Sequence, residues 1–176
     1  MVLDVKKIEA ARSGDKDMFA WVYDTVAPDL YKVALYTLGN PHDAEDAVSE
    51  TFIEAYRGIA KLRDPASFKF WIMKILSARC KRKIKEYIKN RAHVDIEDFA
   101  ANLADASDTG GDAAQRVTVI NALGMLTEQE RLIVSLAVVQ GYSMREVSAI
   151  TGSPQGTVSS KLHRALGKLR KMVEQE

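Results

Sequence analysis

Apolar side chains recur along most of the chain at the 3.6-residue period of an α-helix, and the alternation of apolar and polar residues that marks a β-strand is absent. With only 10 glycines and 4 prolines among 176 residues, few positions interrupt that period. The pattern therefore predicts an all-α fold.

The helix signals are densest between residues 127 and 173. The sequences TEQE, from Thr127, and SMRE, from Ser143, are capping boxes that start two helices, and Gly152 ends the second helix. A serine and a proline at 153 and 154 then start a third, longer helix. Two helices joined by a tight turn, followed by a basic helix, indicate a helix-turn-helix unit, which places its last helix in the major groove of DNA.

The third helix of this unit has an apolar face and a basic face. The apolar face consists of Val158, Leu162, Ala165, Leu166, Leu169 and Val173. The opposite side carries Ser160, Arg164 and Lys171, flanked by Lys161, His163 and Lys168. Small hydroxyl side chains suit base edges, and lysines and arginines hold phosphates, so the pattern favours DNA binding. A solvated face on an ordinary packing helix is the alternative.

The N-terminal part predicts two or three amphipathic helices over residues 4–39, with breaks near Gly14 and Pro28. Their core positions are Phe19, Val22, Tyr23, Val26, Val33, Ala34 and Leu38. A cap and a proline at Asn40 and Pro41 start another helix, with the apolar face Ala44, Val48, Thr51, Phe52, Ala55 and Ile59. Its other face carries Asp43, Asp46, Glu50 and Glu54, and is either solvated or binds a partner with a basic surface.

A short loop around Asp64 and Pro65 leads into a long basic helix. Its core face consists of Phe68, Ile72, Ile75 and Leu76, and a different face of Phe70, Trp71, Lys74, Lys81 and Lys85. Aromatic rings stack on unpaired bases and lysines follow the sugar-phosphate backbone, so the second face favours single-stranded nucleic acid. Partial burial in a second core is the alternative for Trp71.

The sequence divides into two small helical domains, residues 1–91 and 114–176. Residues 92–113 between them are acidic and lack a sustained apolar period, as expected of a flexible, solvated linker.

The net charge of +1 conceals blocks of alternating sign. Residues 1–60 carry 6 basic and 11 acidic side chains, 61–91 carry 11 and 2, 92–130 carry 1 and 8, and 131–176 carry 7 and 3. Each basic block is a candidate phosphate-binding surface. A single DNA-binding site would need only one basic block, so the second block indicates a second nucleic-acid contact.

Other features exclude whole classes of function. The charged N-terminus lacks the apolar core of a secretory signal, and the longest apolar run, LIVSLAVV, is too short to span a bilayer, so we expect a cytoplasmic protein without membrane insertion. Cys80 is the only cysteine, and His42, His93 and His163 show no metal-ligand spacing. Neither clustered carboxylates nor a paired nucleophile and base are recognisable, so we expect no enzyme activity, metal or cofactor.

Three segments carry a resemblance to a known family. They are LYKVALYTLGNPHDAEDAVSETFIEAYRGI, then FKFWIMKIL with its basic continuation, and LTEQERLIVSLAVVQGYSMREVSAITGSPQGTVSSKLHRALGKLR. In this order they resemble the extracytoplasmic-function sigma factors, the minimal members of the sigma-70 class, which direct bacterial RNA polymerase to promoters. The resemblance covers both halves and implies a region 2-like domain and a helix-turn-helix region 4-like domain.

The resemblance also implies partners. The DAEDAVSETF helix would bind the coiled coil of the largest polymerase subunit, with core-binding roles for Asp43, Asp46, Val48, Glu50, Phe52 and Tyr56. The acidic linker would thread the polymerase cleft, and an anti-sigma partner is expected.

Promoter contacts follow from the same resemblance. At the minus-ten element, a loop would capture a flipped base and the following helix would support strand opening, through Lys61, Arg63, Asp64, Phe68, Lys69, Phe70, Trp71, Lys74 and Arg79. At the minus-thirty-five element, the last helix would present Ser159, Ser160, Lys161, His163, Arg164 and Lys168.

The chain departs from the family pattern at three positions. Ala78 and Arg82 stand where the family usually has asparagine and aspartate, and Ser159 replaces a common basic residue. The promoter sequence therefore stays open. The alternative function is a conventional regulator that binds duplex operator DNA without polymerase, although such a protein would need no single-strand surface.

Overall fold

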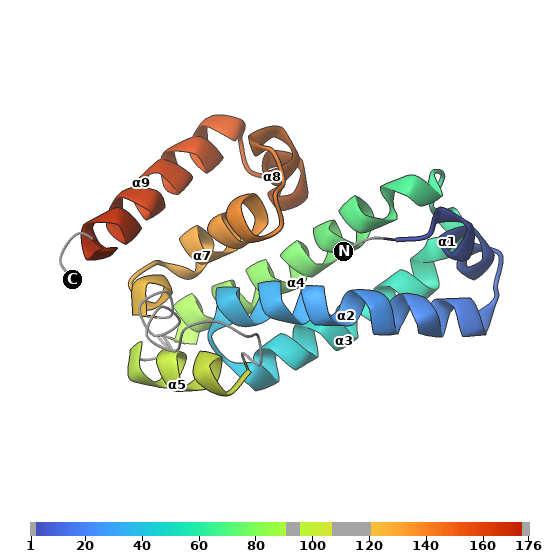
Figure 1. Ribbon diagram of the computed structural model, residues 1–176, viewed down its shortest axis with the longest axis horizontal. Coiled ribbons are helices and arrows are strands. Elements are labelled where there is room, and N and C mark those ends of the chain that lie inside the picture. The colour runs from blue at the N-terminus through green and yellow to red at the C-terminus, as the bar shows by residue number, and fades with distance from the viewer. Residues whose placement is uncertain (1–2, 91–95, 107–120, 174–176) are drawn as a thin grey trace.

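The computed structural model describes residues 3–90, 96–106 and 121–173, and within these residues it is helical without any strand. The all-α prediction is confirmed (Figure 1). The helices are α1 (Val5–Arg12), α2 (Lys16–Leu38), α3 (Pro41–Gly58), the 3-10 turns η1 (Ile59–Lys61) and η2 (Pro65–Ser67), α4 (Phe68–Asn90), α5 (Ile96–Ala106), α7 (Glu128–Val134), the π-helical turn η3 (Ser135–Val139), α8 (Met144–Thr151) and α9 (Gln155–Val173).

Helices α2, α3 and α4 pack together as the body of the N-terminal half, and α1 covers one end (Figure 1). Local signals set the helix ends. The carboxylate of Asp15 and the amide of Asn40 cap the first turns of α2 and α3, and α2 ends at Gly39, whose φ of +70° disfavours other residues. Apolar side chains of all three helices meet in one buried cluster.

Pro28 does not interrupt α2, contrary to the expected break. It lies on an exposed side of the continuous helix, and its neighbours Val26 and Leu30 are both completely buried in the core. A proline inside a helix costs about 3 kcal/mol, but packing on both sides of it holds α2 together. The expected break at Gly14 is present, at a φ of +101°.

The C-terminal half contains the expected three helices of a helix-turn-helix unit. Both capping boxes are formed, between Thr127 and Glu130 and between Ser143 and Glu146, and Gly152 ends α8 in the left-handed conformation. The first helix is lengthened by the turn η3, where the N–H of Gln140 donates to the carbonyl of Ser135, five residues earlier.

Part of the expected linker is folded, which corrects that prediction for residues 96–106. These residues form α5, and Phe99 and Leu103 on this helix are each 1% exposed. Their spacing of four residues is helical, but two apolar side chains are too few to mark a helix in an acidic segment. The other residues of the predicted linker, 92–95 and 107–113, lie outside the described part of the chain.

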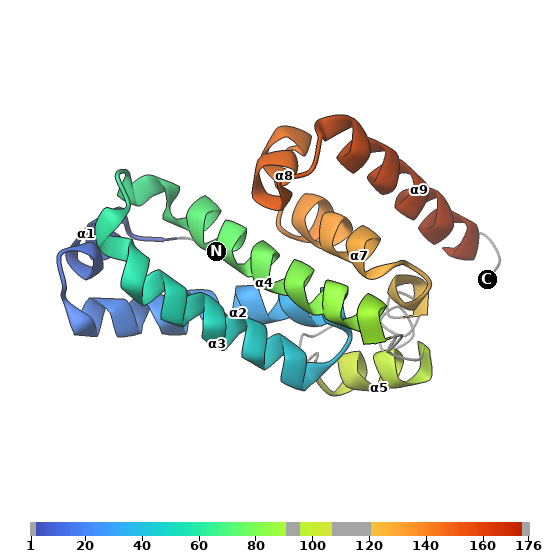
Figure 2. The ribbon, with the colours of Figure 1, turned by 180° about the vertical axis from the view of Figure 1, so that it is seen from behind.

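The two halves share one hydrophobic core. Helix α7 lies between α2 and α4 on one side and α9 on the other, as both views show, and α8 packs directly on α4 (Figure 1, Figure 2). Three consecutive residues of α7, Leu132, Ile133 and Val134, are all buried. A helix that is buried all round needs cover from more than one side, and the N-terminal half supplies the second cover.

Candidate functional site

The acidic face of α3 is paired with basic side chains of α4. The guanidinium of Arg82 lies 2.6 Å from Glu50, and that of Arg79 lies 3.4 Å from Glu50 and also contacts Glu54. The ammonium of Lys83 lies 2.7 Å from Asp43, and 3.6 Å from Asp46. This face is therefore neither simply solvated nor free for an external basic partner, because its carboxylates already pair with basic side chains of α4.

Asp43 is held by two side chains of α4. It accepts hydrogen bonds from Lys83 and from the hydroxyl of Tyr87. Burial alone would raise the pKa of Asp43, but the hydrogen bonds from Lys83 and Tyr87 and the charge of Lys83 hold it below its ordinary value. Asp43 therefore joins the start of α3 to the C-terminal part of α4.

The structure separates the six residues expected to bind polymerase into three groups. Val48 and Phe52 are each 5% exposed and belong to the core. Asp43 and Glu50 are held in the ion pairs with α4, whereas the side chain of Asp46 is 68% exposed and Tyr56 is 55% exposed. Only Asp46 and Tyr56 present most of their surface to a partner, since the helical period turns the apolar members inward.

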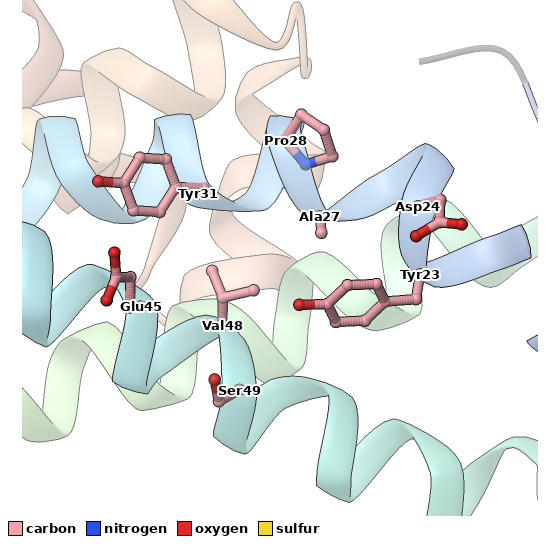
Figure 3. A pocket seen from close by; sticks show the side chains of 8 residues that line it. All are labelled: Tyr23, Asp24, Ala27, Pro28, Tyr31, Glu45, Val48 and Ser49. Carbon is pink, nitrogen blue, oxygen red and sulfur yellow. The ribbon is translucent and has the colours of Figure 1, made fainter. Parts of the chain in front are cut away.

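A groove lies between the outer sides of α2 and α3. Its volume is about 500 Å³, and Val48 of α3 lies between Tyr23 and Tyr31 of α2 (Figure 3). The carboxylates of Asp24 and Glu45 lie at its edges, and burial together with Glu45 raises the pKa of Tyr31. Sequence reasoning placed Tyr23 in the core, but it is 45% exposed and its ring packs on Phe52 at 4.6 Å between centroids.

The face of α4 expected to bind a melted strand is only partly open. Phe68 is completely buried, so its expected DNA contact is not possible in this conformation. Trp71 is half-buried, its ring 5.7 Å from that of Phe68, and it presses against Gly58, where a Cβ would lie 3.1 Å from the indole. Phe70 and Lys69 are also half-buried, and Lys74 is exposed.

Helix α9 presents the residues expected to read the minus-thirty-five element. Ser159, Ser160, His163 and Arg164 are exposed, and Val158 and Ala165 on the other side are buried. The remaining two basic residues have partners on α7. Lys161 contacts the amide oxygen of Gln129, and Lys168 lies 2.8 Å from the carboxylate of Glu130.

Comparisons with known proteins give two family matches. Residues 22–91 match the model of sigma-70 region 2, and residues 122–171 match that of sigma-70 region 4. Together they cover more than half of the chain. The chain belongs to the sigma-70 family, in its extracytoplasmic-function group. It is a promoter-specificity factor for RNA polymerase. The alternative function, a conventional regulator that binds duplex operator DNA without polymerase, is therefore wrong.

Curated relatives span nearly the same length. The chain is 27% identical to the extracytoplasmic-function sigma factor SigW of Bacillus subtilis (strain 168) over 96% of its own length and 95% of the relative's. It is 26% identical to the sigma factor CarQ of Myxococcus xanthus, over 94% and 95% of the two chains.

Solved structures share the fold. CnrH, solved in complex with the cytosolic domain of CnrY, superposes with a TM-score of 0.68 at 22% identity, over 98% of both chains. The sigma factor RpoE of Bartonella quintana, solved in complex with the anti-sigma factor NepR, gives the same TM-score and identity over 89% of this chain and 96% of that one.

Sequence reasoning missed Arg12, which holds the region 2 loop that contains Lys61, Arg63 and Asp64. Its guanidinium donates to the carbonyl oxygens of Leu62 at 3.2 Å and Arg63 at 3.3 Å. All three loop residues are exposed, and the carboxylate of Asp64 also accepts from the N–H of Ala66, 3.0 Å away. Fifty residues separate Arg12 from the loop, so no local motif marks this contact.

Region 4 of this sigma factor rests on the basic face of α4. The ammonium of Lys81 donates to the carbonyl of Thr151 at the end of α8, and the hydroxyl of Tyr142 donates to the carbonyl of Lys69 at 3.4 Å. Burial lowers the pKa of Lys81, and the charges of Lys85 and Lys161 lower it further. The basic helices α4 and α9 therefore lie near each other at the boundary between the two halves.

Neither a metal centre nor a membrane span is found in the part of the chain that the structure describes. Its histidine, cysteine, aspartate and glutamate side chains do not gather in groups of three that could hold a metal ion, and none of its helices is long and apolar enough to cross a membrane. The thiol of Cys80 is buried, and burial raises its pKa to about 12.

Proposed function

We propose that this sigma factor binds polymerase core through the outer faces of α2 and α3 and contacts promoter DNA through α4 and α9. Two surfaces on opposite sides of region 2 support this division. The face of α3 turned away from α4 is exposed and partly apolar, whereas α4 carries the aromatic and basic side chains.

The polymerase surface is centred on the exposed side of α3. Ile53 and Tyr56 are 52% and 55% exposed, and Ser49 and Asp46 lie one and two turns before Ile53 on the same helix. Exposed large apolar residues beside acidic ones fit a partner that carries apolar and basic side chains. The groove beside Val48 extends this surface onto α2, and Glu50 stabilises it through Arg82 rather than touching polymerase.

The minus-ten surface consists of the loop that Arg12 holds and the start of α4. Lys61, Arg63 and Asp64 are exposed on this loop, where backbone and side-chain donors could receive a flipped base. Phe70 and Trp71 supply the aromatic surface, and Lys69 and Lys74 the positive charge. Phe68 supports this surface from beneath, whereas Arg79 is paired with Glu50 and Glu54 on α3.

The minus-thirty-five surface is the outer face of α9. Ser160 and Arg164 lie one turn apart and the Arg164 Nε–H donates to the carbonyl of Ser160 at 3.3 Å, which leaves its terminal nitrogens to contact a base. Ser159 and His163 flank them, and Lys161 and Lys168 hold phosphates.

Other partners follow from the family. The RpoE structure with NepR supports the proposal that an anti-sigma factor binds this chain as well. As an initiation factor the chain would act in the cytoplasm, where the polymerase works, and would catalyse no reaction of its own.

Transcription with purified bacterial core polymerase, this protein and sheared genomic DNA from its source tests the proposal. Mapped transcript starts are expected to share two sequence elements upstream, and to disappear when the protein is left out. Tight DNA binding without polymerase, together with no specific starts, would contradict it.

A further inference from the structure

A pocket with basic walls lies between α4 and the end of α8. Its volume is about 420 Å³, which falls within the range of about 300 to 1,000 Å³ that is typical of small-molecule sites. Helix α4 contributes Lys74, Ser77, Ala78, Lys81, Arg82 and Lys85 to the lining, and α8 and its cap contribute Ile150, Thr151 and Gly152. The α4 residues recur at helical spacing, so one face of this helix forms a continuous wall.

Three lysines give this pocket a positive charge that no carboxylate neutralises. Among the described residues, its lining includes neither aspartate nor glutamate. Lys74 and Lys85 each lack an acidic partner at salt-bridge distance in the part of the chain that the structure describes. Arg82 differs from them, because Glu50 of α3 holds its guanidinium. The three ammonium groups are therefore available to an anion.

Lys81 carries its charge in an unfavourable environment. Its ammonium donates to the carbonyl of Thr151, which supplies only the partial negative charge of a helix C-terminus. Its pKa is lowered by burial and by the charges of Lys85 and Lys161. An anion in the pocket would offset the repulsion among these lysines, so the electrostatics of this site favour an occupied state.

A buried serine adds a neutral donor to the same pocket. Ser77 is 1% exposed, and its Oγ has no hydrogen-bond partner among the described residues. Buried hydroxyl groups are usually paired, because an unpaired one has lost its bonds to water without replacement. Rotation of this side chain toward a ligand oxygen breaks no hydrogen bond within the protein, so the Ser77 hydroxyl is available to donate.

Two residues of the lining are departures of this chain from the family pattern. Ala78 stands where the family usually has asparagine, and its short side chain leaves room beside Lys74 and Lys81. Arg82 stands where the family usually has aspartate, so a carboxylate is absent from the lining and a cation takes its place. The room and the charge of this pocket are therefore features of this chain.

We propose that this pocket binds a small organic diphosphate, of which a nucleoside diphosphate is the simplest kind. Lys74, Lys81 and Lys85 hold the phosphate oxygens, and the hydroxyl of Ser77 donates to one of them. Ile150 on α8 offers apolar surface to the organic group. The phosphates of DNA share this chemistry, but α8 forms one wall of the pocket, so a compact ligand fits it better than a continuous strand.

Calorimetric titration of the full chain with adenosine diphosphate tests the site. Saturable binding is expected, with weaker binding of inorganic pyrophosphate, which lacks the organic group, and none of adenosine, which lacks the phosphates. Lys81→Met and Lys85→Ala should each weaken binding of the diphosphate about tenfold, because each removes a charge-assisted hydrogen bond. Lys89→Ala, which removes the same charge from an exposed position of α4 outside the pocket, should leave the affinity unchanged.

A steric variant separates the pocket from a general attraction of charges. Ala78→Leu fills the lining at an exposed position without a change of charge, and leucine is a good helix former, so binding should weaken while helical content stays the same. This variant also keeps the test decisive if Lys81→Met does not fold.

Three results would overturn the proposal. They are no saturable binding of adenosine diphosphate, equal weakening by Lys89→Ala and Lys85→Ala, and unchanged binding in folded Ala78→Leu. A short single-stranded oligonucleotide is titrated in parallel. If it binds more tightly than the diphosphate and loses affinity in the same variants, these lysines belong to the DNA surface and the proposal is wrong. The titrations contain neither polymerase nor a promoter, so failure of this site is distinguishable from failure of the proposed function.

Discussion

The guanidinium of Arg82 lies 2.6 Å from both carboxylate oxygens of Glu50. This contact explains one departure from the family pattern, because the basic residue at 82 has an acidic partner on α3. It also changes the role expected for Glu50. Because Arg82 and Arg79 already hold this carboxylate, its role is to stabilise the packing of α3 on α4 rather than to bind another protein.

Charge exchange separates these roles. Glu50→Lys should destabilise the protein and weaken polymerase binding, since it places a lysine beside two arginines. Adding Arg82→Glu should restore both, with a coupling of about 0.5 to 1 kcal/mol in a urea-denaturation cycle, because the pair is partly exposed. Recovery of stability without recovery of binding would instead show that Glu50 contacts polymerase. Arg57→Glu, on an exposed part of α3, is the control.

Arg12 should position the minus-ten loop. Arg12→Ala removes two charge-assisted hydrogen bonds to the backbone of Leu62 and Arg63, so promoter opening should fall by roughly tenfold. Permanganate reactivity of unpaired thymines measures opening, and polymerase binding should not change. Lys16→Ala, at an exposed position nearby, should open promoters normally. Equal opening by Arg12→Ala and the parent would remove the positioning role.

Phe70 and Trp71 should matter more for opening than for closed-complex formation. Phe70→Ala and Trp71→Ala take stacking surface away from unpaired bases, a loss of about 1 to 3 kcal/mol per base. Phe68→Ala provides the contrast, because it empties a completely buried site and should cost about 3 to 5 kcal/mol of stability. If Phe70→Ala and Trp71→Ala reduce both steps equally and lower the unfolding midpoint as Phe68→Ala does, their role is structural.

Arg164 should read a base, and Lys168 should hold a phosphate. Arg164→Ala should cost about 1 to 3 kcal/mol of binding and relax the preference at one promoter position. Lys168→Ala should weaken binding of all sequences alike and reduce its salt dependence. A promoter scanned base by base, transcribed with each variant, measures the difference. An even loss across all bases for Arg164→Ala would assign this residue to the phosphate backbone.

Asp43 should contribute to the acid sensitivity of the protein. Its pKa is lowered in the folded state, so the stability it adds is present above the ordinary pKa of aspartate, near 4, and is lost as the pH falls through the lower folded value. Asp43→Asn should cost about 1 to 3 kcal/mol at neutral pH. It should also flatten the decrease of unfolding free energy below about pH 4. If the decrease of unfolding free energy at acid pH is the same in Asp43→Asn and in the parent, the contacts of Lys83 and Tyr87 with residue 43 do not depend on its charge.

Much of the architecture was predictable because its determinants are local. The two capping boxes, the terminating Gly152 and the start of α3 at Asn40 each depend on side chains within four residues of the backbone groups they satisfy. The apolar face of α9 and its exposed Ser160 and Arg164 follow from helical periodicity in the same way.

The site was predictable only in part. Periodicity placed Phe52 and Phe68 correctly in the core, but the family resemblance also gave them roles at a surface, which their burial does not allow in this structure. Pairing of Glu50 with Arg82, and of Arg12 with the loop at Leu62, joins residues more than 30 positions apart. Such pairs leave no periodic signal in either segment.

The sequence by itself determined most of the helices, the ends marked by capping residues and the family, because these depend on contacts within a few turns and on motifs that are contiguous in the chain. Only the tertiary structure decided that α7 is covered on both sides, that Phe99 joins Gly39 to Arg131, and that Pro28 continues α2. Each of these depends on apolar surface buried between distant segments, and the free energy of that burial is set by which segments meet rather than by the residues of either one alone.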